Sequence, residues 1–229
     1  MTQNLFIITS AINAKRSVFS REERIFQTRK TVESIISKDP TASLVMVEST
    51  SEDSEVEDIW SKIGVPIINI RNQKLLELSE AKLHSPAEAL SMLTAINYLE
   101  KDGRLDQFSR IFKISGRYRL SQGFDIDVYN NPDMVGKFVF LKRLESWQDE
   151  MRRGVTGADH LLSTRLWSMD RNLVSVYLGF IERVFNDCLS FGIDLEHSMW
   201  KHIPKDNLFE LPRTFVEGEL SACGETISD

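Results

Sequence analysis

The sequence has few cysteines, no long apolar run and no low-complexity or repeated stretch. The two cysteines, Cys188 and Cys223, form no C-x-x-C pair and are too few to staple a secreted fold, so we expect a buried free thiol and a thiol in the tail. Near the amino terminus only Leu5 to Ile8 is continuously apolar. We therefore expect neither a signal peptide nor a membrane-spanning helix, and a cytoplasmic protein that meets a membrane, if at all, peripherally from the cytosolic side.

The charge pattern contains no long basic stripe. The formal net charge is −6, from 28 Lys and Arg against 34 Asp and Glu, which argues against duplex nucleic acid as the main ligand. A small anion stays compatible with this charge, because a few placed Arg and Lys side chains can hold a diphosphate. Hydrophobic residues at 41% and charged residues at 27% are typical of a globular chain, and no linker interrupts it, so we predict a single domain over residues 1–229.

The first half alternates between strand and helix signals. Short β-branched runs at Leu5 to Ile8 and Leu44 to Val47 predict strands buried on both faces. Between them, Ser20 and Glu23 form a capping box that predicts a helix ending at Asp39. An acidic helix capped by Ser51 or Ser54 and ending before Gly64, a strand over 65–70 and a helix starting at Ser85 follow. This alternation predicts right-handed βαβ units and a mostly parallel α/β sheet flanked by helices.

The second half is predicted to be more helical. Strands are expected at Arg110 to Leu120 and at Lys137 to Leu141. The apolar spacing from Leu173 to Cys188 predicts a long helix that ends at Gly192. The tail from Lys205 receives no predicted structure.

Ligands of open α/β sheets bind outside the carboxyl ends of the strands, so the residues that follow each predicted strand are the candidate site. In chain order these are Thr9, Ser10 and Asn13, then Glu48 to Asp53, then Arg71 and Lys74, and then Ser115 to Tyr118.

In that order the segments resemble the nucleotide half of GT-A glycosyltransferases, a Rossmann-like fold. The segments that carry the resemblance are Phe6 to Asn13, Thr31 to Ile35 and Val45 to Asp53. The resemblance covers residues 5–143, which would be the nucleotide-binding half, and leaves 144–229 as the acceptor side. It implies a nucleotide-sugar donor and a glycan, lipid-linked or protein acceptor. It also implies that Glu48 accepts a hydrogen bond from the nucleotide base, and that the donor is held by Thr9, Ser10, Glu48, Lys113, Gly116 and Arg117.

One motif of the family is altered. The family holds a divalent cation, Mn²⁺ or Mg²⁺, with Asp-x-Asp at the end of the fourth strand, where this chain has Ser115 to Tyr118. Either Asp125 and Asp127 supply the carboxylates, with His197 or His202 as a third ligand, or Lys113 and Arg117 replace the cation. Both alternatives stay open, and we favour the second.

Inverting sugar transfer requires an acceptor for the proton of the attacking hydroxyl, and the second half offers two acid-histidine neighbours. These are Asp159 with His160 and Glu196 with His197, and we take Asp159 and Glu196 as the candidate catalytic residues. Three tryptophans are candidate sugar-stacking platforms, namely Trp147, Trp167 and Trp200.

The sequence thus favours a glycosyltransferase. The altered Asp-x-Asp position keeps open a catalytically inactive nucleotide- or glycan-binding module, and an interaction protein that uses the domain as a scaffold is a third possibility.

Overall fold

The part of the chain covered by the computed structural model leaves short gaps. It describes residues 3–14, 17–50, 60–61, 64, 67–68, 73–101, 103–220 and 223–229. Most of the helix predicted between Ser51 and Gly64, and Arg71, lie outside the described residues.

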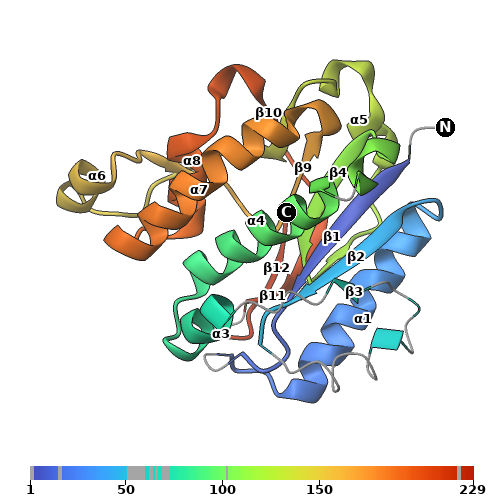
Figure 1. The fold of residues 1–229 in the computed structure, drawn as a ribbon, viewed down its shortest axis with the longest axis horizontal. Helices are drawn as coiled ribbons and strands as arrows, with labels where there is room; N and C mark the ends of the chain where they lie inside the picture. The colour runs from blue at the N-terminus through green and yellow to red at the C-terminus, as the bar shows by residue number, and fades with distance from the viewer. Residues whose placement is uncertain are drawn as a thin grey trace.

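The centre of the molecule is a seven-stranded sheet with the order β10-β6-β9-β4-β1-β2-β3 (Figure 1). Its strands are β1 Asn4–Ser10, β2 Ser43–Glu48, β3 Ile67–Ile68, β4 Arg110–Ser115, β6 Phe138–Leu141, β9 Leu166–Asp170 and β10 Leu208–Leu211. The pairs β1–β2, β1–β4, β2–β3 and β6–β10 are parallel, whereas β9 pairs antiparallel with β4 and β6. The predicted mostly parallel α/β sheet is confirmed.

Helices cover both faces of this sheet, because successive side chains of a strand point to opposite faces. Leu5 and Ile7 of β1 pack in one apolar cluster with the helices α4 His84–Lys101 and α7 Val174–Phe191. Phe6 and Ile8 pack in the other cluster with α1 Arg21–Lys38. These four strand side chains are at most 1% exposed, and burial of each stabilises the fold by about 1.5–3 kcal/mol.

Smaller elements surround this core. The remaining helices are α3 Gln73–Glu80, α5 Ile126–Asn130, α6 Glu150–Thr156 and α8 Leu195–His202, with 3-10 turns at Arg104–Gln107, Pro132–Met134, Arg171–Leu173 and Lys205–Asn207. The remaining strands are β5 Tyr118–Leu120, β7 Leu144–Glu145, β8 His160–Leu161, β11 Val216–Glu219 and β12 Thr226–Ser228.

The capping box at the start of α1 is confirmed, and it fixes where the helix begins. Ser20 Oγ accepts from Glu23 N at 3.2 Å, and Ser20 N donates to Glu23 Oε2 at 2.6 Å. Arg24 and Thr28 are four residues apart and therefore lie on the same face of α1, where both are buried.

The strand predicted from Arg110 to Leu120 is divided into β4 and β5, because the chain changes sheet at Gly116. Gly116 N donates to Thr9 O at 2.8 Å, which ends β4, and β5 then pairs with β11 in a separate sheet of three strands. A Cβ on Gly116 would lie 2.9 Å from Thr28 Oγ1 and 3.3 Å from Thr9 O, so the crossing requires glycine.

The second half is less helical than predicted. The helix ending at Gly192 is confirmed as α7, and Gly192 closes it with φ 63°. However, β9 inserts antiparallel beside β4, and the tail forms β10, β11 and β12. In addition, α4 begins at His84 and not after Ser85.

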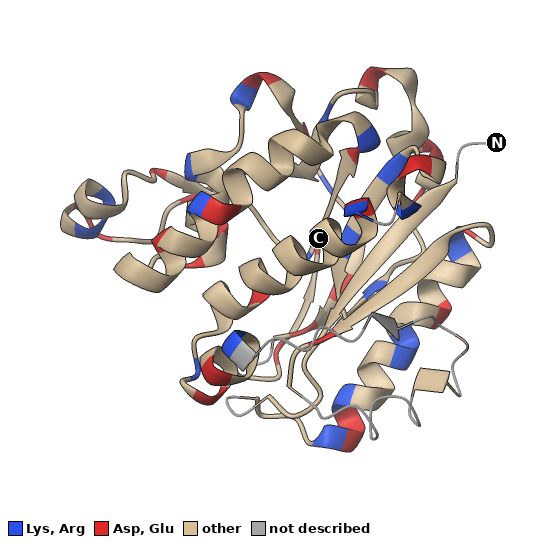
Figure 2. Ribbon diagram, viewed as in Figure 1, with Lys and Arg blue, Asp and Glu red and all other residues tan. Residues whose placement is uncertain are grey.

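The burial of the two cysteines agrees with the prediction from the sequence. Acidic and basic segments are interspersed over the ribbon (Figure 2). Cys188 is buried and Cys223 exposed, and both are free thiols. Within the described ranges no helix combines the length and the apolar character needed to cross a membrane.

Candidate functional site

A cavity of about 430 Å³ opens at the carboxyl ends of β1, β2 and β4. The strand ends contribute Thr9, Ser10, Ser49 and Ser115 to its lining, and the predicted Gly116 and Arg117 belong to it as well. It is enclosed by α1 on one face of the sheet and by α3 and α4 on the other. The strand-end rule therefore located the cavity.

One side of the cavity is cationic. Arg24 of α1 and Arg117 of the β4–β5 turn both line it. Burial, and next the positive charge of Arg117, lower the pKa of the Arg24 guanidinium to about 10. Arg24 Nε donates to Ser17 Oγ at 3.0 Å, while Arg117 donates to Glu219 O at 3.2 Å and lies over the Tyr118 ring. These contacts hold two like charges at one cavity wall, an arrangement that favours an anionic ligand.

Several hydroxyl groups line the cavity, and Glu48 positions that of Thr50. The Glu48 carboxylate is 2% exposed and does not line the cavity. It accepts from Ile12 N at 3.2 Å, from Thr50 N at 2.9 Å and from Thr50 Oγ1 at 2.6 Å. The predicted contact between Glu48 and a nucleotide base is therefore replaced by bonds that tie together the loops after β1 and β2.

The other side of the cavity carries a carboxylate, Glu88 of α4. Its Oε1 accepts a short hydrogen bond from Lys113 Nζ. Lys113 also donates to Ser115 Oγ at 2.8 Å and to Thr164 O at 2.6 Å, and its side chain is 1% exposed. The prediction that Lys113 contacts a donor diphosphate is thus corrected: the alternation of β4 aims Lys113 at α4, beneath the cavity wall.

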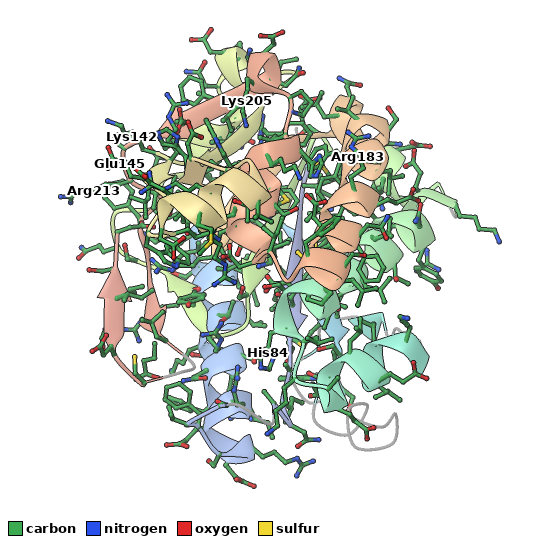
Figure 3. The ribbon with its side chains drawn as sticks, turned by 90° about the vertical axis from the view of Figure 1, so that its left-hand side faces the viewer. His84, Lys142, Glu145, Arg183, Lys205 and Arg213 are labelled. Carbon is green, nitrogen blue, oxygen red and sulfur yellow. The ribbon has the colours of Figure 1, made fainter. Side chains whose placement is uncertain are left out.

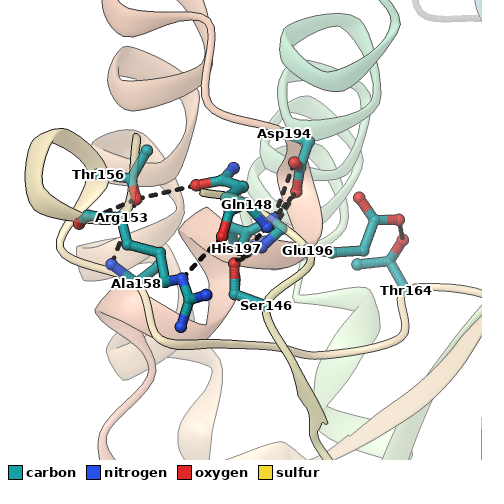
Figure 4. A network of polar contacts seen from close by, with 9 residues as sticks. All are labelled: Ser146, Gln148, Arg153, Thr156, Ala158, Thr164, Asp194, Glu196 and His197. Atoms are coloured by element: carbon teal, nitrogen blue, oxygen red, sulfur yellow. Dashed lines mark hydrogen bonds and ion pairs between the residues drawn. The ribbon is translucent and has the colours of Figure 1, made fainter. Parts of the chain in front are cut away.

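Glu196 is linked to the Lys113–Glu88 ion pair through Thr164, whose backbone oxygen accepts from Lys113. Thr164 Oγ1 donates to Glu196 Oε1 at 2.7 Å (Figure 4). Burial, and next the charge of Glu88, raise the pKa of the Glu196 carboxyl. The predicted catalytic residue Glu196 therefore neighbours the acidic side of the cavity without lining it.

His197 is a structural residue of α8. Its ring is fully buried, with Nδ1 2.6 Å from Asp194 Oδ1 and Nε2 2.9 Å from Ser146 Oγ (Figure 4). Both ring nitrogens are therefore engaged, which leaves none to bind a metal ion.

Asp159 lies in a separate cluster. Its side chain is 70% exposed and accepts from Trp200 Nε1 at 2.8 Å. Lys205 Nζ lies 3.5 Å from the centre of the Trp200 ring. Figure 3 shows Lys205 well separated from His84, which lines the cavity. Asp159 is therefore not brought to the cavity.

The three tryptophans predicted as sugar platforms differ in exposure. Trp167 and Trp200 are buried, at 3% and 8% exposed, whereas Trp147 is 69% exposed and packs edge-on against the His197 ring. Only Trp147 of these three has a free face, and its contact with a sugar stays a prediction.

The residues predicted to bind a divalent cation are not brought together. Asp125 caps α5, its Oδ1 accepting from Asp127 N at 2.9 Å, and both side chains are exposed. α5 lies beside the amino-terminal end of β1, the opposite end of the sheet from the cavity (Figure 1). Across the described residues no three His, Cys, Asp or Glu side chains gather as a metal site. Asp125, Asp127 and His197 are thus not placed to hold one Mn²⁺ or Mg²⁺ ion together.

The strand-end rule does not give Arg24 and Glu88, the arginine and the glutamate that helices contribute to the cavity. The signal available was position: Arg24 stands one turn after the capping box, and Glu88 stands in the first turns of the helix that begins near Ser85.

No known protein family matches the sequence, and no curated protein matches it. Among solved structures, the chain is similar to the mannosyltransferase Ktr4p from S. cerevisiae, with a TM-score of 0.58 and 6% identity over 92% of this chain and 68% of that one. This likeness shows that the two chains share a fold.

Two bacterial structures are more weakly similar. One is a putative nucleotide-diphospho-sugar transferase from Desulfovibrio desulfuricans, with a TM-score of 0.49 and 9% identity over 92% of this chain and 80% of that one. The other is a cytidylyltransferase from Leptospira borgpetersenii, with a TM-score of 0.46 and 14% identity over 100% of this chain and 82% of that one. These two similarities are too weak to add to the fold assignment.

Proposed function

We propose that the protein transfers a sugar from a nucleotide-sugar donor to a hydroxyl group of a glycan, lipid-linked or protein acceptor. The observation that carries this proposal is the pair of guanidinium groups, Arg24 and Arg117, in a cavity at the carboxyl ends of β1 and β4. Every residue that lines this cavity in the described part of the chain falls within 5–143, the half expected to bind the donor, which leaves 144–229 for the acceptor.

In this proposal the donor diphosphate lies against the cationic side. Each guanidinium can give paired N–H donors to phosphate oxygens. The hydroxyl groups of Thr9 and Ser10 supply further donors along the same wall, and Ser49 and Thr50 face the nucleoside.

The reaction breaks the bond between the anomeric carbon and the diphosphate oxygen and forms a bond from that carbon to the acceptor oxygen, which loses its proton. Negative charge develops on the departing nucleoside diphosphate. Arg24 and Arg117 would stabilise that charge by preorganised hydrogen bonds, the role that a divalent cation has in the family. The proton acceptor is left unassigned, because neither Asp159 nor Glu196 lines the cavity.

A second candidate is a nucleotide-sugar-binding module without transferase activity. It is favoured by a different observation: Asp159 and Glu196, the carboxylates predicted for proton transfer, lie outside the cavity lining. Such a module would use Arg24 and Arg117 in the same way and would leave the donor intact.

One experiment separates the two candidates. The protein is incubated with UDP-, GDP-, CDP- and dTDP-sugars, with and without EDTA, and chromatography measures the nucleoside diphosphate that is released. Slow donor hydrolysis by the wild type and its loss in Arg117→Gln support the transferase. Binding of a donor without release supports the module. Absence of both binding and release contradicts the proposal and favours an interaction protein that uses the domain as a scaffold.

A further inference from the structure

The described wall of the cavity is split by charge. Arg24 and Arg117 stand on the side of α1 and the β4–β5 turn, and Glu88 stands on the side of α4. α1 and α4 pack on opposite faces of the sheet, so the cavity spans the edge of the sheet from a cationic to an acidic side. A ligand that fits both sides has an anionic part and a part rich in hydrogen-bond donors.

Lys113 cannot be the group that meets this ligand, because its donors are used. A lysine ammonium has three N–H donors. Those of Lys113 go to Glu88 Oε1, Ser115 Oγ and Thr164 O, with the side chain 1% exposed. Lys113 is thus a buried charge whose partners are all protein atoms.

Glu88 has acceptor capacity left over. A carboxylate offers about four lone-pair sites. Among the described residues, the hydrogen bond to Glu88 comes from Lys113 and reaches Oε1, while 30% of the side chain stays exposed at the cavity. The ion pair restrains the Glu88 carboxylate, and Oε2 has no hydrogen-bond donor among the described residues.

We infer that Glu88, held in place by Lys113, accepts hydrogen bonds from hydroxyl groups of the donor's sugar and thereby selects the sugar. This inference rests on the proposed function. Arg24 and Arg117 attract a diphosphate, whereas a carboxylate offers it no hydrogen-bond donor and can accept from a sugar hydroxyl. The two sides therefore orient the donor with its diphosphate at α1 and its sugar at α4.

The test compares sugar nucleotides with their parent nucleoside diphosphates by isothermal titration calorimetry. UDP, GDP and dTDP are titrated beside UDP-glucose, GDP-mannose and dTDP-glucose into wild type and Glu88→Gln. For the nucleotide that binds, we expect the dissociation constant of the parent diphosphate to change less than about twofold and that of the sugar nucleotide to rise about tenfold or more, since tenfold corresponds to about 1.4 kcal/mol.

Two further variants keep the result interpretable. Glu33→Gln, at an exposed glutamate of α1 paired with Lys30, should change neither constant. The double variant Glu88→Gln with Lys113→Met removes the buried charge together with its partner, and should show the same sugar-specific loss even where the single variant folds poorly.

The outcomes that contradict the inference differ from failure of the proposed function. Equal weakening of parent and sugar nucleotide, or no weakening of either, overturns the role of Glu88 while leaving the donor site intact. Wild type that binds sugar nucleotides no better than their parent diphosphates overturns it as well. Wild type that binds no nucleoside diphosphate at all overturns the proposed function and the inference with it.

Discussion

Arg24 and Arg117 reach the same cavity wall from segments that are far apart in the sequence, and burial together with the charge of Arg117 lowers the pKa of Arg24 to about 10. Arg24 is buried at 7% exposure, so its charge is poorly solvated. An anion between the two groups would offset both effects, because its negative charge favours the charged form of Arg24. The pair is therefore the strongest indication of ligand chemistry in the described chain.

Arg24→Gln and Arg117→Gln should each weaken binding of a nucleoside diphosphate. A hydrogen bond to a charged group contributes about 1.5–3 kcal/mol, which corresponds to roughly 10- to 150-fold in the dissociation constant. Titration calorimetry measures this loss. Arg29→Gln, at an exposed position of the same helix, is the matched control and should bind as wild type. Wild-type affinity in both cavity variants would contradict the assignment.

Gly116→Ala should destabilise the protein at the cavity wall beside Arg117. The new Cβ would meet Thr28 Oγ1 at 2.9 Å and the backbone oxygen of Thr9 at 3.3 Å, so we expect the free energy of unfolding to fall by about 1–3 kcal/mol. Chemical denaturation measures this change.

The matched control for this change is Gly179→Ala, within α7. No heavy atom lies within 4 Å of its added Cβ, and the helix propensity of alanine should raise stability by about 0.5–1 kcal/mol. If Gly116→Ala proves as stable as the control, the close approach of Gly116 to α1 is not a constraint.

Asp125→Ala should lower the stability of the protein without changing its affinity for a nucleoside diphosphate. Asp125 caps α5 through a bond to Asp127 N, and loss of an N-cap costs about 0.5–2 kcal/mol of stability. The dissociation constant of a nucleoside diphosphate should not change, because α5 is remote from the cavity (Figure 1). A large loss of affinity would restore Asp125 as a cation ligand.

Glu196 should make stability depend on pH in a predictable direction. Its pKa is raised in the folded protein above the ordinary value of 4.5, first by burial and then by Glu88. The folded state therefore holds a proton that the unfolded state releases, and the stability present below the unfolded pKa is lost as pH rises through the folded pKa.

Glu196→Gln removes this dependence and keeps an oxygen to accept from Thr164. We expect its melting temperature to exceed that of wild type at pH 7, by about 2–4 °C for each kcal/mol, and the difference to shrink towards pH 4. Thermal denaturation across this range is the check. A variant equally destabilised at both pH values would show that Glu196 acts only through packing.

The elements that could be predicted carry local signals. The capping box of Ser20 and Glu23, the buried runs of β1 and β2 and the glycine after α7 each depend on neighbours in the chain. The break at Gly116 could not be read in this way, since it depends on Thr9 and Thr28. The insertion of β9 between β4 and β6 is likewise set by tertiary pairing.

The candidate site was predicted in part for the same reason. The strand-end rule gives Thr9, Ser10 and Gly116, because the direction of parallel strands fixes which edge they share. The rule does not predict the direction of a side chain, and Lys113 points towards Glu88 of α4 and not into the cavity. Nor does it predict Arg24, which reaches the cavity because α1 packs against the sheet. Helix residues enter a cavity only once the helices are docked, and their docking was not visible in the sequence.

Binding of UDP, GDP, CDP and dTDP to the wild-type protein in EDTA, measured by titration calorimetry and repeated with Mn²⁺, tests the central claim most directly. A cavity whose guanidinium pair holds the diphosphate should bind one of these nucleotides with a dissociation constant that changes little between the two conditions. Binding that disappears in EDTA, or no binding in either condition, would contradict the claim.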